Sequence, residues 1–280
     1  MKYFGKYNTD SDVQNALDSG ELNKPYVALV SGTTLDYNSK IPSIEVPLTF
    51  NVTSSGNVVW WDYNQNHPLQ YSKNGGQWTN TSGSSTTISV VSGDTVQFRG
   101  NNQSYNDGYE GFSNTDCNFT LSGNIMSLLS ATSFGELTSV PVSGLTFLFF
   151  MCGGLTDASE LIMPATDLSE YCYYGLFQEC ISLTKAPVLP AQALAEGSYR
   201  QLFVNCPLTY IKCLATDISA TDCLYQWVLG VPSTCGSSSS SSSTDAPPFE
   251  GGTFVKAASM EDWEFGESGI PCGWTVEDDA

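Results

Sequence analysis

Apolar residues recur at helical spacing in the middle of the chain. Between residues 145 and 206, three sets occupy positions i, i+3, i+4 and i+7. The sets are Leu145, Leu148, Phe149 and Cys152; Tyr173, Leu176, Phe177 and Cys180; and Tyr199, Leu202, Phe203 and Cys206. This spacing places four apolar side chains on one face of a helix, so it predicts three short helices. Each set is followed by a Leu-Thr pair and a short apolar run, which predicts a strand after each helix.

The three sets belong to a sequence repeat. The shared frame is Leu-Phe-x-x-Cys followed by Leu-Thr, and it recurs after 28 residues (Phe149 to Phe177) and 26 residues (Phe177 to Phe203). Such a period predicts a solenoid, in which each unit buries its apolar face against its neighbours. A degenerate last unit is expected to place Trp227 where Phe203 stands in the unit before. The predicted repeat core is Leu148, Phe149, Cys152, Leu176, Phe177, Cys180, Leu202, Phe203, Cys206 and Trp227.

Residues 44–122 show strand-like patterns instead. Val46 to Val52 alternates apolar and polar residues, as expected for a half-buried strand. Asn74-Gly75 favours a hairpin turn, because both residues tolerate positive φ. Further strands are predicted at 57–62, 69–72, 77–79, 87–91, 95–99 and 117–121. Short strands at this spacing predict a small β-sandwich.

The remaining segments complete a predicted order of three parts. Residues 1–43 are too few to bury much surface alone, so they are expected to dock on a partner or to pack on the next domain. Residues 123–280 are expected to form the repeat solenoid with a C-terminal cap. A Ser-rich insertion at 236–251 is predicted to be a flexible loop. The predicted fold class is therefore mainly β with short helices.

The repeat residues also resemble a known family. The resemblance rests on residues 171–177, Cys180, 182–187 and 189–191, with extensions at 123–128, 252–258 and 269–276. These stretches resemble the BspA-type leucine-rich repeats, which occur in surface proteins of gut Bacteroidetes and in their phages. Residues 20–30 and 35–38 are similar to the N-terminal segments of several Bacteroides-phage virion and related proteins. The resemblance implies a leucine-rich-repeat solenoid that binds a partner, and it brings no catalytic motif with it.

The charge of the chain narrows the range of partners. The sequence has 29 acidic and 10 basic residues, which gives a net charge of −19. Nucleic-acid binding depends largely on Lys and Arg neutralising phosphates, so no nucleic-acid partner is expected. No apolar run reaches about 18 residues, so no membrane insertion is expected. Residues 1–10 hold no apolar signal core. This favours a phage virion protein over an exported bacterial adhesin, with a trimmed signal as the alternative.

The nine cysteines are interpreted mainly as core residues. Cys152, Cys180 and Cys206 fall on the buried repeat position, which predicts a ladder of reduced thiols that pack as small apolar groups. Disulfides and zinc are the competing interpretations. The sequence has no Cys-x-x-Cys pair, which weakens the case for zinc. Synthesis in the cytoplasm argues against disulfides.

Candidate catalytic and metal-binding residues are few. His67 has no Ser, Cys or Asp constellation around it, so no catalytic triad is predicted. The sequence Asp62-x-Asn64-x-Asn66 starts like a calcium loop but lacks the glycine and glutamate that such a loop requires. We predict no catalytic, cofactor or metal site. Trp60, Trp61 and Trp78 are interpreted as core residues of the sandwich. The alternative is that these rings, with Tyr105 and Tyr109, stack on sugars.

These observations lead to one expected function and two alternatives. The chain is expected to be a structural virion protein, a head fibre or capsid decoration, that displays its repeats to glycans or proteins of the host surface or mucus. Residues 1–43 are expected to contact other virion proteins, and a homo-oligomer is expected. The first alternative is an exported bacterial surface adhesin with the same repeats. The second is a glycan-active enzyme, although an enzyme is not expected.

Overall fold

The computed structural model describes residues 45–103, 105, 110–113, 115–234, 251–261 and 263–279. Strands dominate this part of the chain, and its two helices are short 3₁₀ turns, η1 (Ile125–Leu128) and η2 (Phe134–Glu136). The prediction of a mainly β protein is therefore confirmed. Residues 1–43 and most of the predicted Ser-rich insertion lie outside the described residues.

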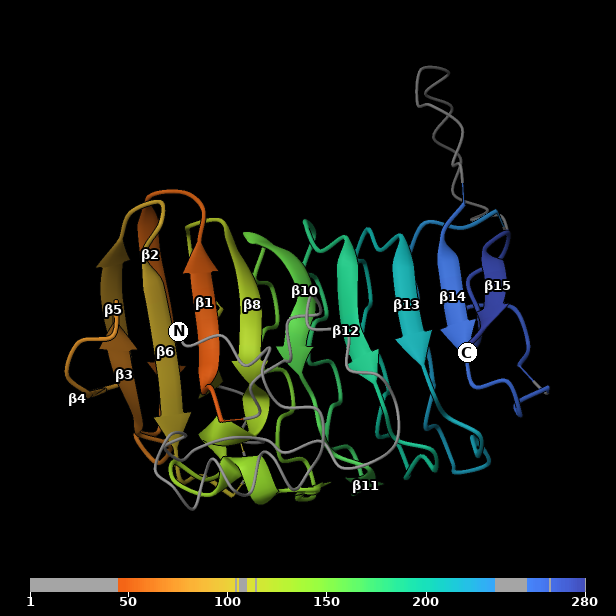
Figure 1. The fold of residues 1–280 in the computed structure, drawn as a ribbon, viewed down its shortest axis with the longest axis horizontal. Coiled ribbons are helices and arrows are strands. Elements are labelled where there is room, and N and C mark those ends of the chain that lie inside the picture. Colours follow the sequence, from red (N-terminus) through yellow and green to blue (C-terminus); the bar gives the residue numbers. More distant parts are fainter. Residues whose placement is uncertain are drawn as a thin grey trace, which may run out of the picture.

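One long sheet runs through the molecule (Figure 1). Its strand order is β15-β14-β13-β12-β10-β8-β1-β6-β3-β4. The strands are β1 (Leu48–Val52), β3 (Leu69–Lys73), β4 (Thr79–Asn80), β6 (Thr95–Gly100), β8 (Phe119–Asn124), β10 (Leu155–Ile162), β12 (Lys185–Leu189), β13 (Tyr210–Cys213), β14 (Thr253–Lys256) and β15 (Thr275–Asp278). Neighbours from β8 to β15 are parallel, whereas those from β8 to β4 are antiparallel. The expected boundary between residues 122 and 123 lies within β8, which pairs with both halves.

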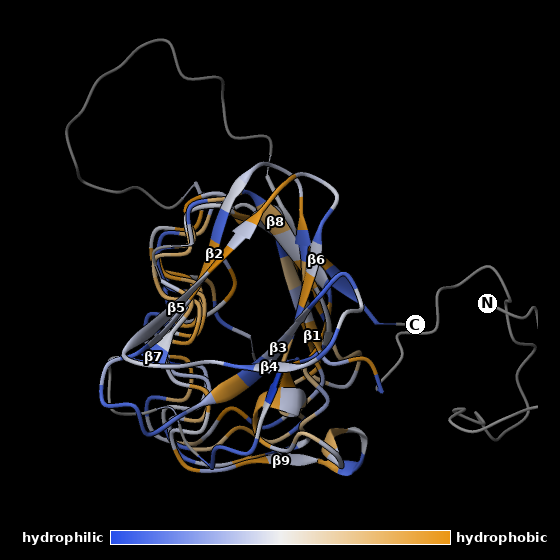
Figure 2. Cartoon of the chain, turned by 90° about the vertical axis from the view of Figure 1, so that its left-hand side faces the viewer, coloured by the Kyte–Doolittle hydropathy of each residue, from blue (hydrophilic) through white to orange (hydrophobic). Residues whose placement is uncertain are grey.

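A second layer faces this sheet. Strands β2 (Gly56–Asp62), β5 (Ser85–Val90) and β7 (Glu110–Gly111) form a three-stranded sheet in the order β5-β2-β7. Viewed along the long axis, the ten-stranded sheet lies on one side and the turn segments of the repeats lie on the other (Figure 2). Just after β7, the N–H of Phe112 donates to the carbonyl of Leu148. Both layers of the N-terminal part therefore continue into the repeats. A two-stranded sheet, β9 (Ser139–Val140) with β11 (Asp167–Leu168), completes the described strands.

Each of the three segments predicted to be a helix is instead a coil, that is, a chain of consecutive tight turns. Within the first, Phe150 donates to the Phe147 carbonyl three residues earlier, which is the bond of a tight turn and not the four-residue bond of an α-helix. Every second backbone N–H instead donates to a carbonyl of the next coil: Phe149 donates to Leu176 at 3.0 Å, and Met151 donates to Gln178 at 2.9 Å. Phe147 and Met151 have left-handed backbones, with φ of 55° and 58°.

The helix prediction is therefore wrong, and the reason is where the N–H groups bond. A helix would satisfy them internally, whereas here every second one joins a neighbouring coil. Each left-handed non-glycine residue costs roughly 1–3 kcal/mol, and these bonds between coils offset that cost.

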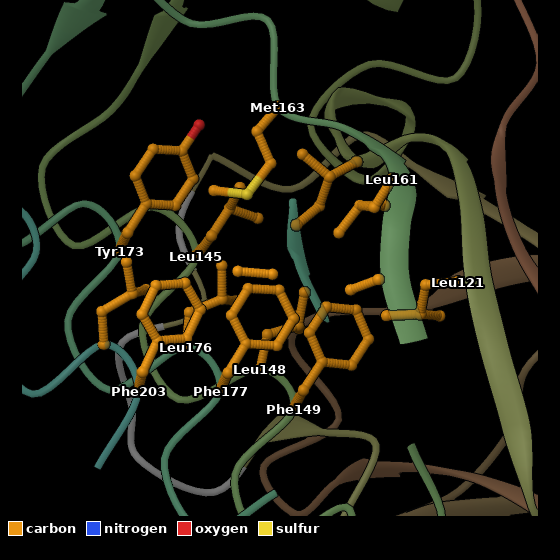
Figure 3. Close-up of a cluster of buried hydrophobic side chains, with 14 of the residues drawn as sticks. Leu121, Leu145, Leu148, Phe149, Leu161, Met163, Tyr173, Leu176, Phe177 and Phe203 are labelled. Carbon is orange, nitrogen blue, oxygen red and sulfur yellow. The ribbon is translucent and has the colours of Figure 1, made fainter. Parts of the chain in front are cut away.

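The apolar pattern nevertheless predicts which side chains are buried. All ten residues of the predicted repeat core are 0% exposed. Phe149, Phe177 and Phe203 form a row of nearly parallel rings, with centroids 5.4 Å and 5.7 Å apart (Figure 3). At its N-terminal end the row continues through Phe112, whose ring stacks on Phe149 at 5.5 Å. The N-terminal part and the repeats thus share one core.

Trp227 joins this row from a position different from the predicted one. Phe177 donates its N–H to Leu202, the residue before Phe203, and Phe203 donates to Trp227. In each coil the accepting residue comes directly before the residue equivalent to the donor. Val228, which follows Trp227, is therefore the backbone equivalent of Phe203. The Trp227 ring still lies 6.1 Å from that of Phe203, and its Nε1 donates to the Gly269 carbonyl at 2.8 Å. The last coil therefore adds Trp227 to the aromatic row, one residue before the backbone equivalent of Phe203.

The three repeat cysteines form a hydrogen-bonded ladder. The thiols of Cys152, Cys180 and Cys206 are free and buried. They donate to the carbonyls of Phe112, Phe149 and Phe177 at 3.1, 3.1 and 3.0 Å, respectively. The prediction of reduced core thiols is confirmed at these positions. Outside this ladder, Cys272 is disulfide-bonded, so the competing disulfide interpretation holds for that residue although cytoplasmic synthesis argued against it.

Truncating the central ring of the aromatic row is expected to destabilise the fold. Phe177→Ala removes a fully buried ring that stacks on both sides, so it should lower the free energy of unfolding by about 3–5 kcal/mol. Chemical denaturation monitored by tryptophan fluorescence measures this change. Ile181→Ala is the matched control, because Ile181 is 65% exposed; its effect should stay within about 0.5 kcal/mol. Equal, small effects of both substitutions would contradict the observed packing.

The cysteine ladder predicts slow alkylation of the native protein. Burial raises the pKa of the Cys152, Cys180 and Cys206 thiols above its usual range. The reactive thiolate should therefore be scarce at pH 8. Iodoacetamide labelling followed by peptide mass spectrometry should find these three residues unmodified until denaturant is added. Rapid native labelling at these positions would show that they are accessible.

Candidate functional site

Aromatic side chains form a continuous strip on the turn side of the repeats. We define the aromatic strip as Phe147, Phe150, Tyr171, Tyr174, Arg200 and Tyr225, all of which are partly or fully exposed. Phe147 contacts Phe150 at 5.6 Å and Tyr174 at 4.6 Å between ring centroids. The Arg200 guanidinium lies 5.8 Å from the Tyr174 ring and 4.3 Å from the Tyr225 ring. The strip thus crosses four successive coils.

The repeat geometry places these residues. Tyr174, Arg200 and Tyr225 each lie three residues before the backbone-equivalent residues Phe177, Phe203 and Val228. Because the coils stack in register, equivalent positions become neighbours on the surface.

Glycines make room for two rings of the strip. Gly175 has a φ of +60°, and a Cβ there would lie 2.1 Å from the Phe147 ring. Gly197 has a φ of +57°, and a Cβ there would lie 2.4 Å from the Tyr171 ring. A larger residue at either position would push the aromatic ring away from its neighbours.

Carboxylates border the aromatic strip. The Tyr171 hydroxyl donates to Glu196 at 3.1 Å, and this hydrogen bond raises the pKa of Tyr171. Arg200 pairs with Asp222. Every described Lys and Arg is similarly engaged: Lys73 with Asp94, Arg99 with Gln70 and Trp78, Lys185 with Asp157, Lys212 with Asp279, and Lys256 with Asp278. The described surface therefore offers acceptor groups in excess and little uncompensated positive charge.

A polar groove of about 620 Å³ lies at the N-terminal end of the molecule. Amide side chains of Gln70, Asn80 and Asn102 line it. Gln70 donates to Asn80 at 3.0 Å, and Asn102 donates to the Tyr105 hydroxyl at 2.8 Å. Since these amides already bond to one another or to the protein, the groove presents fewer available groups than its composition suggests.

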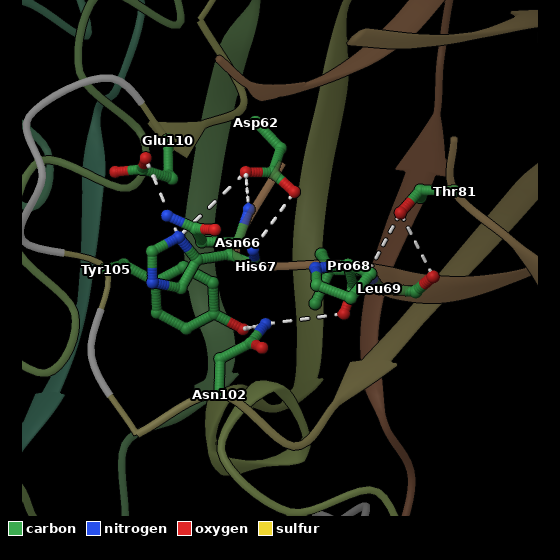
Figure 4. A network of polar contacts seen from close by, with 9 residues as sticks. All are labelled: Asp62, Asn66, His67, Pro68, Leu69, Thr81, Asn102, Tyr105 and Glu110. Atoms are coloured by element: carbon green, nitrogen blue, oxygen red, sulfur yellow. Dashed lines mark hydrogen bonds and ion pairs between the residues drawn. The ribbon is translucent and has the colours of Figure 1, made fainter. Parts of the chain in front are cut away.

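Three potential metal ligands meet beside this groove (Figure 4). Asp62 ends β2, Glu110 begins β7, and the two are partners in the antiparallel pairing. The His67 Nδ1 lies 3.6 Å from a Glu110 oxygen and 4.0 Å from an Asp62 oxygen. The Asp62 carboxylate also accepts the backbone N–H groups of Asn66 and His67, both at 3.0 Å. These two bonds fold the loop back and bring His67 to the carboxylates.

Two of the five aromatic residues considered from the sequence lie in the core. Trp60 and Tyr105 are fully buried and contact each other at 5.7 Å. Trp61 and Trp78 are half-buried, and Arg99 covers the Trp78 ring at 4.0 Å. Tyr109 lies outside the described residues. Sequence reasoning missed the aromatic strip. The signal was partial, because Tyr174 and Arg200 lie three residues before the predicted core residues Phe177 and Phe203, whereas Tyr225 lies only two before Trp227.

No protein-family model, no curated protein and no solved structure matches this chain. The resemblance to BspA-type repeats stays a prediction on these comparisons. Over the described ranges, no helix has the length and apolar character needed to cross a lipid bilayer.

Proposed function

We propose that this chain is a non-enzymatic structural protein of a phage virion, a head fibre or capsid decoration, that binds carbohydrate at the host surface or in mucus. Its binding region would be a leucine-rich-repeat solenoid of the BspA type. The observation that carries the binding role is the aromatic strip. Residues 1–43 would attach the protein to other virion proteins, and several copies would assemble together.

The strip has the chemistry that carbohydrate recognition needs. Exposed aromatic rings offer flat apolar faces, and Tyr adds a polar edge that can hydrogen-bond. The carboxylates of Glu196 and Asp222 border these faces and can accept hydrogen bonds from sugar hydroxyls. Contiguous exposed apolar groups on a soluble surface commonly mark interaction sites. The excess of acidic groups favours a neutral glycan over an anionic one.

The repeat geometry supports the solenoid assignment. Strands β10, β12, β13, β14 and β15 are successive and parallel. The coils from Leu145 to Val231 bond to one another in a constant pattern and bury one aromatic row. Each unit buries its apolar face only against its neighbours, as repeat architectures do. The short strands and tight turns leave a broad surface for binding.

An exported bacterial surface adhesin is the second candidate. It would use the same strip, and the sequence resemblance covers proteins of both kinds. The two candidates differ in location: one predicts the protein in purified particles, and the other predicts it on the bacterial cell envelope.

Removing rings from the strip is expected to weaken glycan binding. Tyr174→Ala and Tyr225→Ala should each lower affinity about tenfold or more, as truncation of a central contact typically does. A glycan array probed with the purified full chain would identify ligands, and titration calorimetry would measure the change. Tyr210→Ala is the matched control, because Tyr210 is 37% exposed but lies on the ten-stranded sheet. Glycan binding that is insensitive to both strip substitutions would overturn this assignment.

Deleting residues 1–43 is expected to abolish incorporation into particles. The described strands pair with one another, so the shortened chain is expected to fold. Circular dichroism would test folding, and immunoblots of purified particles would test incorporation. Particles that retain the shortened chain would show that the attachment lies elsewhere. Absence of even the full-length chain from particles would favour the adhesin.

A further inference from the structure

We propose that Asp62, His67 and Glu110 form a binding site for a divalent transition-metal ion of the Zn²⁺ type. Their donor atoms all lie within 4.8 Å of one another. The site is separate from the aromatic strip and has no part in the function proposed above. Its role would be to fasten the loop after β2 to the start of β7.

The spacing of the donor atoms fits a metal better than direct hydrogen bonds. The His67 Nδ1 lies 3.6 and 4.0 Å from the two carboxylates, which is beyond hydrogen-bonding distance. Metal–ligand bonds of about 2.0–2.2 Å at tetrahedral angles place neighbouring donors roughly 3.3–3.6 Å apart. For all three donors to reach one ion, the His67 distances would shorten by a few tenths of an ångström and the widest donor pair, at up to 4.8 Å, by about 1 Å.

Burial makes the cluster different from an exposed group of acids. The side chains of Asp62 and Glu110 are 4% and 0% exposed, and that of His67 is 14% exposed. The His67 Nδ1 is buried and makes no hydrogen bond within the described residues. Two carboxylates held side by side away from water favour a cation between them. A dication between the three donors would neutralise both carboxylates and coordinate the imidazole nitrogen.

The surroundings hold the ligands in place. The Asp62 oxygens keep further lone pairs for a metal after accepting the two backbone N–H groups. The His67 ring packs against Tyr105 with centroids 5.4 Å apart. Tyr105 is itself fixed by its hydroxyl, which donates to the Leu128 carbonyl at 2.9 Å. A ligand held by such outer contacts loses less freedom when it binds metal.

The ligand set also indicates which ion the site would prefer. Calcium and magnesium favour sites made only of oxygen atoms. One imidazole nitrogen with two carboxylate oxygens suits zinc and its first-row neighbours. Three protein ligands leave a position for water, so the site would be open on one side.

Zinc binding by the full-length protein tests this proposal. We expect the EDTA-treated wild-type chain to bind one equivalent of Zn²⁺ in calorimetry, even with excess Ca²⁺ present. Saturating Zn²⁺ should raise the melting temperature by about 5 °C or more. His67→Gln should weaken binding about tenfold or more, whereas the exposed control Glu136→Gln should leave it unchanged.

Asp62→Asn provides a second variant if His67→Gln does not fold. It keeps a carbonyl oxygen for the loop but removes a charged ligand, so it should also weaken zinc binding. Stoichiometric zinc that is unaffected by both variants would place the ion on the cysteines or the acidic surface, and would overturn the proposal. Absence of zinc binding, with His67→Gln still destabilising, would overturn it in favour of a purely structural contact of the imidazole with the carboxylates.

Discussion

The bonding of alternate backbone N–H groups to the next coil is the interaction on which the structure depends. A turn segment with left-handed residues at every fourth position is unstable alone. In this molecule, Phe149, Phe177 and Phe203 each donate to the following coil, and their rings stack in the same direction. Hydrogen bonds and apolar burial therefore act between the same neighbours. Neither would be available to a single isolated repeat.

Such an array needs closed ends, and the chain provides two different ones. At the start, Phe50 contacts Phe112 and Phe119, and β8 presents an edge on which β10 pairs in parallel. At the other end, Trp227 stacks on Trp263 at 5.9 Å. The last strand, β15, is exposed along its whole length and carries Glu277 and Asp278. Charges on an edge strand discourage pairing with another chain.

The sequence pattern predicts burial better than backbone conformation. Residues at i, i+3, i+4 and i+7 all point inward, but a helix and a chain of turns produce that pattern equally. The two conformations differ in whether a backbone N–H donates to a carbonyl of the same coil or of a neighbouring coil. The sequence of a single coil does not show which of the two occurs. The shift from Phe203 to Val228 was hidden for a similar reason, because the Trp227 ring fills the place of a phenylalanine.

The two candidate sites differ in how far the sequence could reveal them. Tyr174, Arg200 and Tyr225 recur at one repeat position, so these three residues of the aromatic strip follow once the backbone register is known. Asp62 and Glu110 lie far apart in the chain, and only the pairing of β2 with β7 brings them together. His67 reaches them through a turn that Asp62 itself stabilises. No local motif contains all three residues.

Native-state hydrogen exchange at the repeat coils tests the central claim most directly. The backbone amides of Phe149, Phe177 and Phe203 lie in turn segments, where amides usually exchange quickly. If these amides bond to the next coil, they should exchange as slowly as the amides of the buried central strand β1. Rapid exchange at all three positions, while β1 stays protected, would contradict the account, because the coils would then not be joined through their backbones.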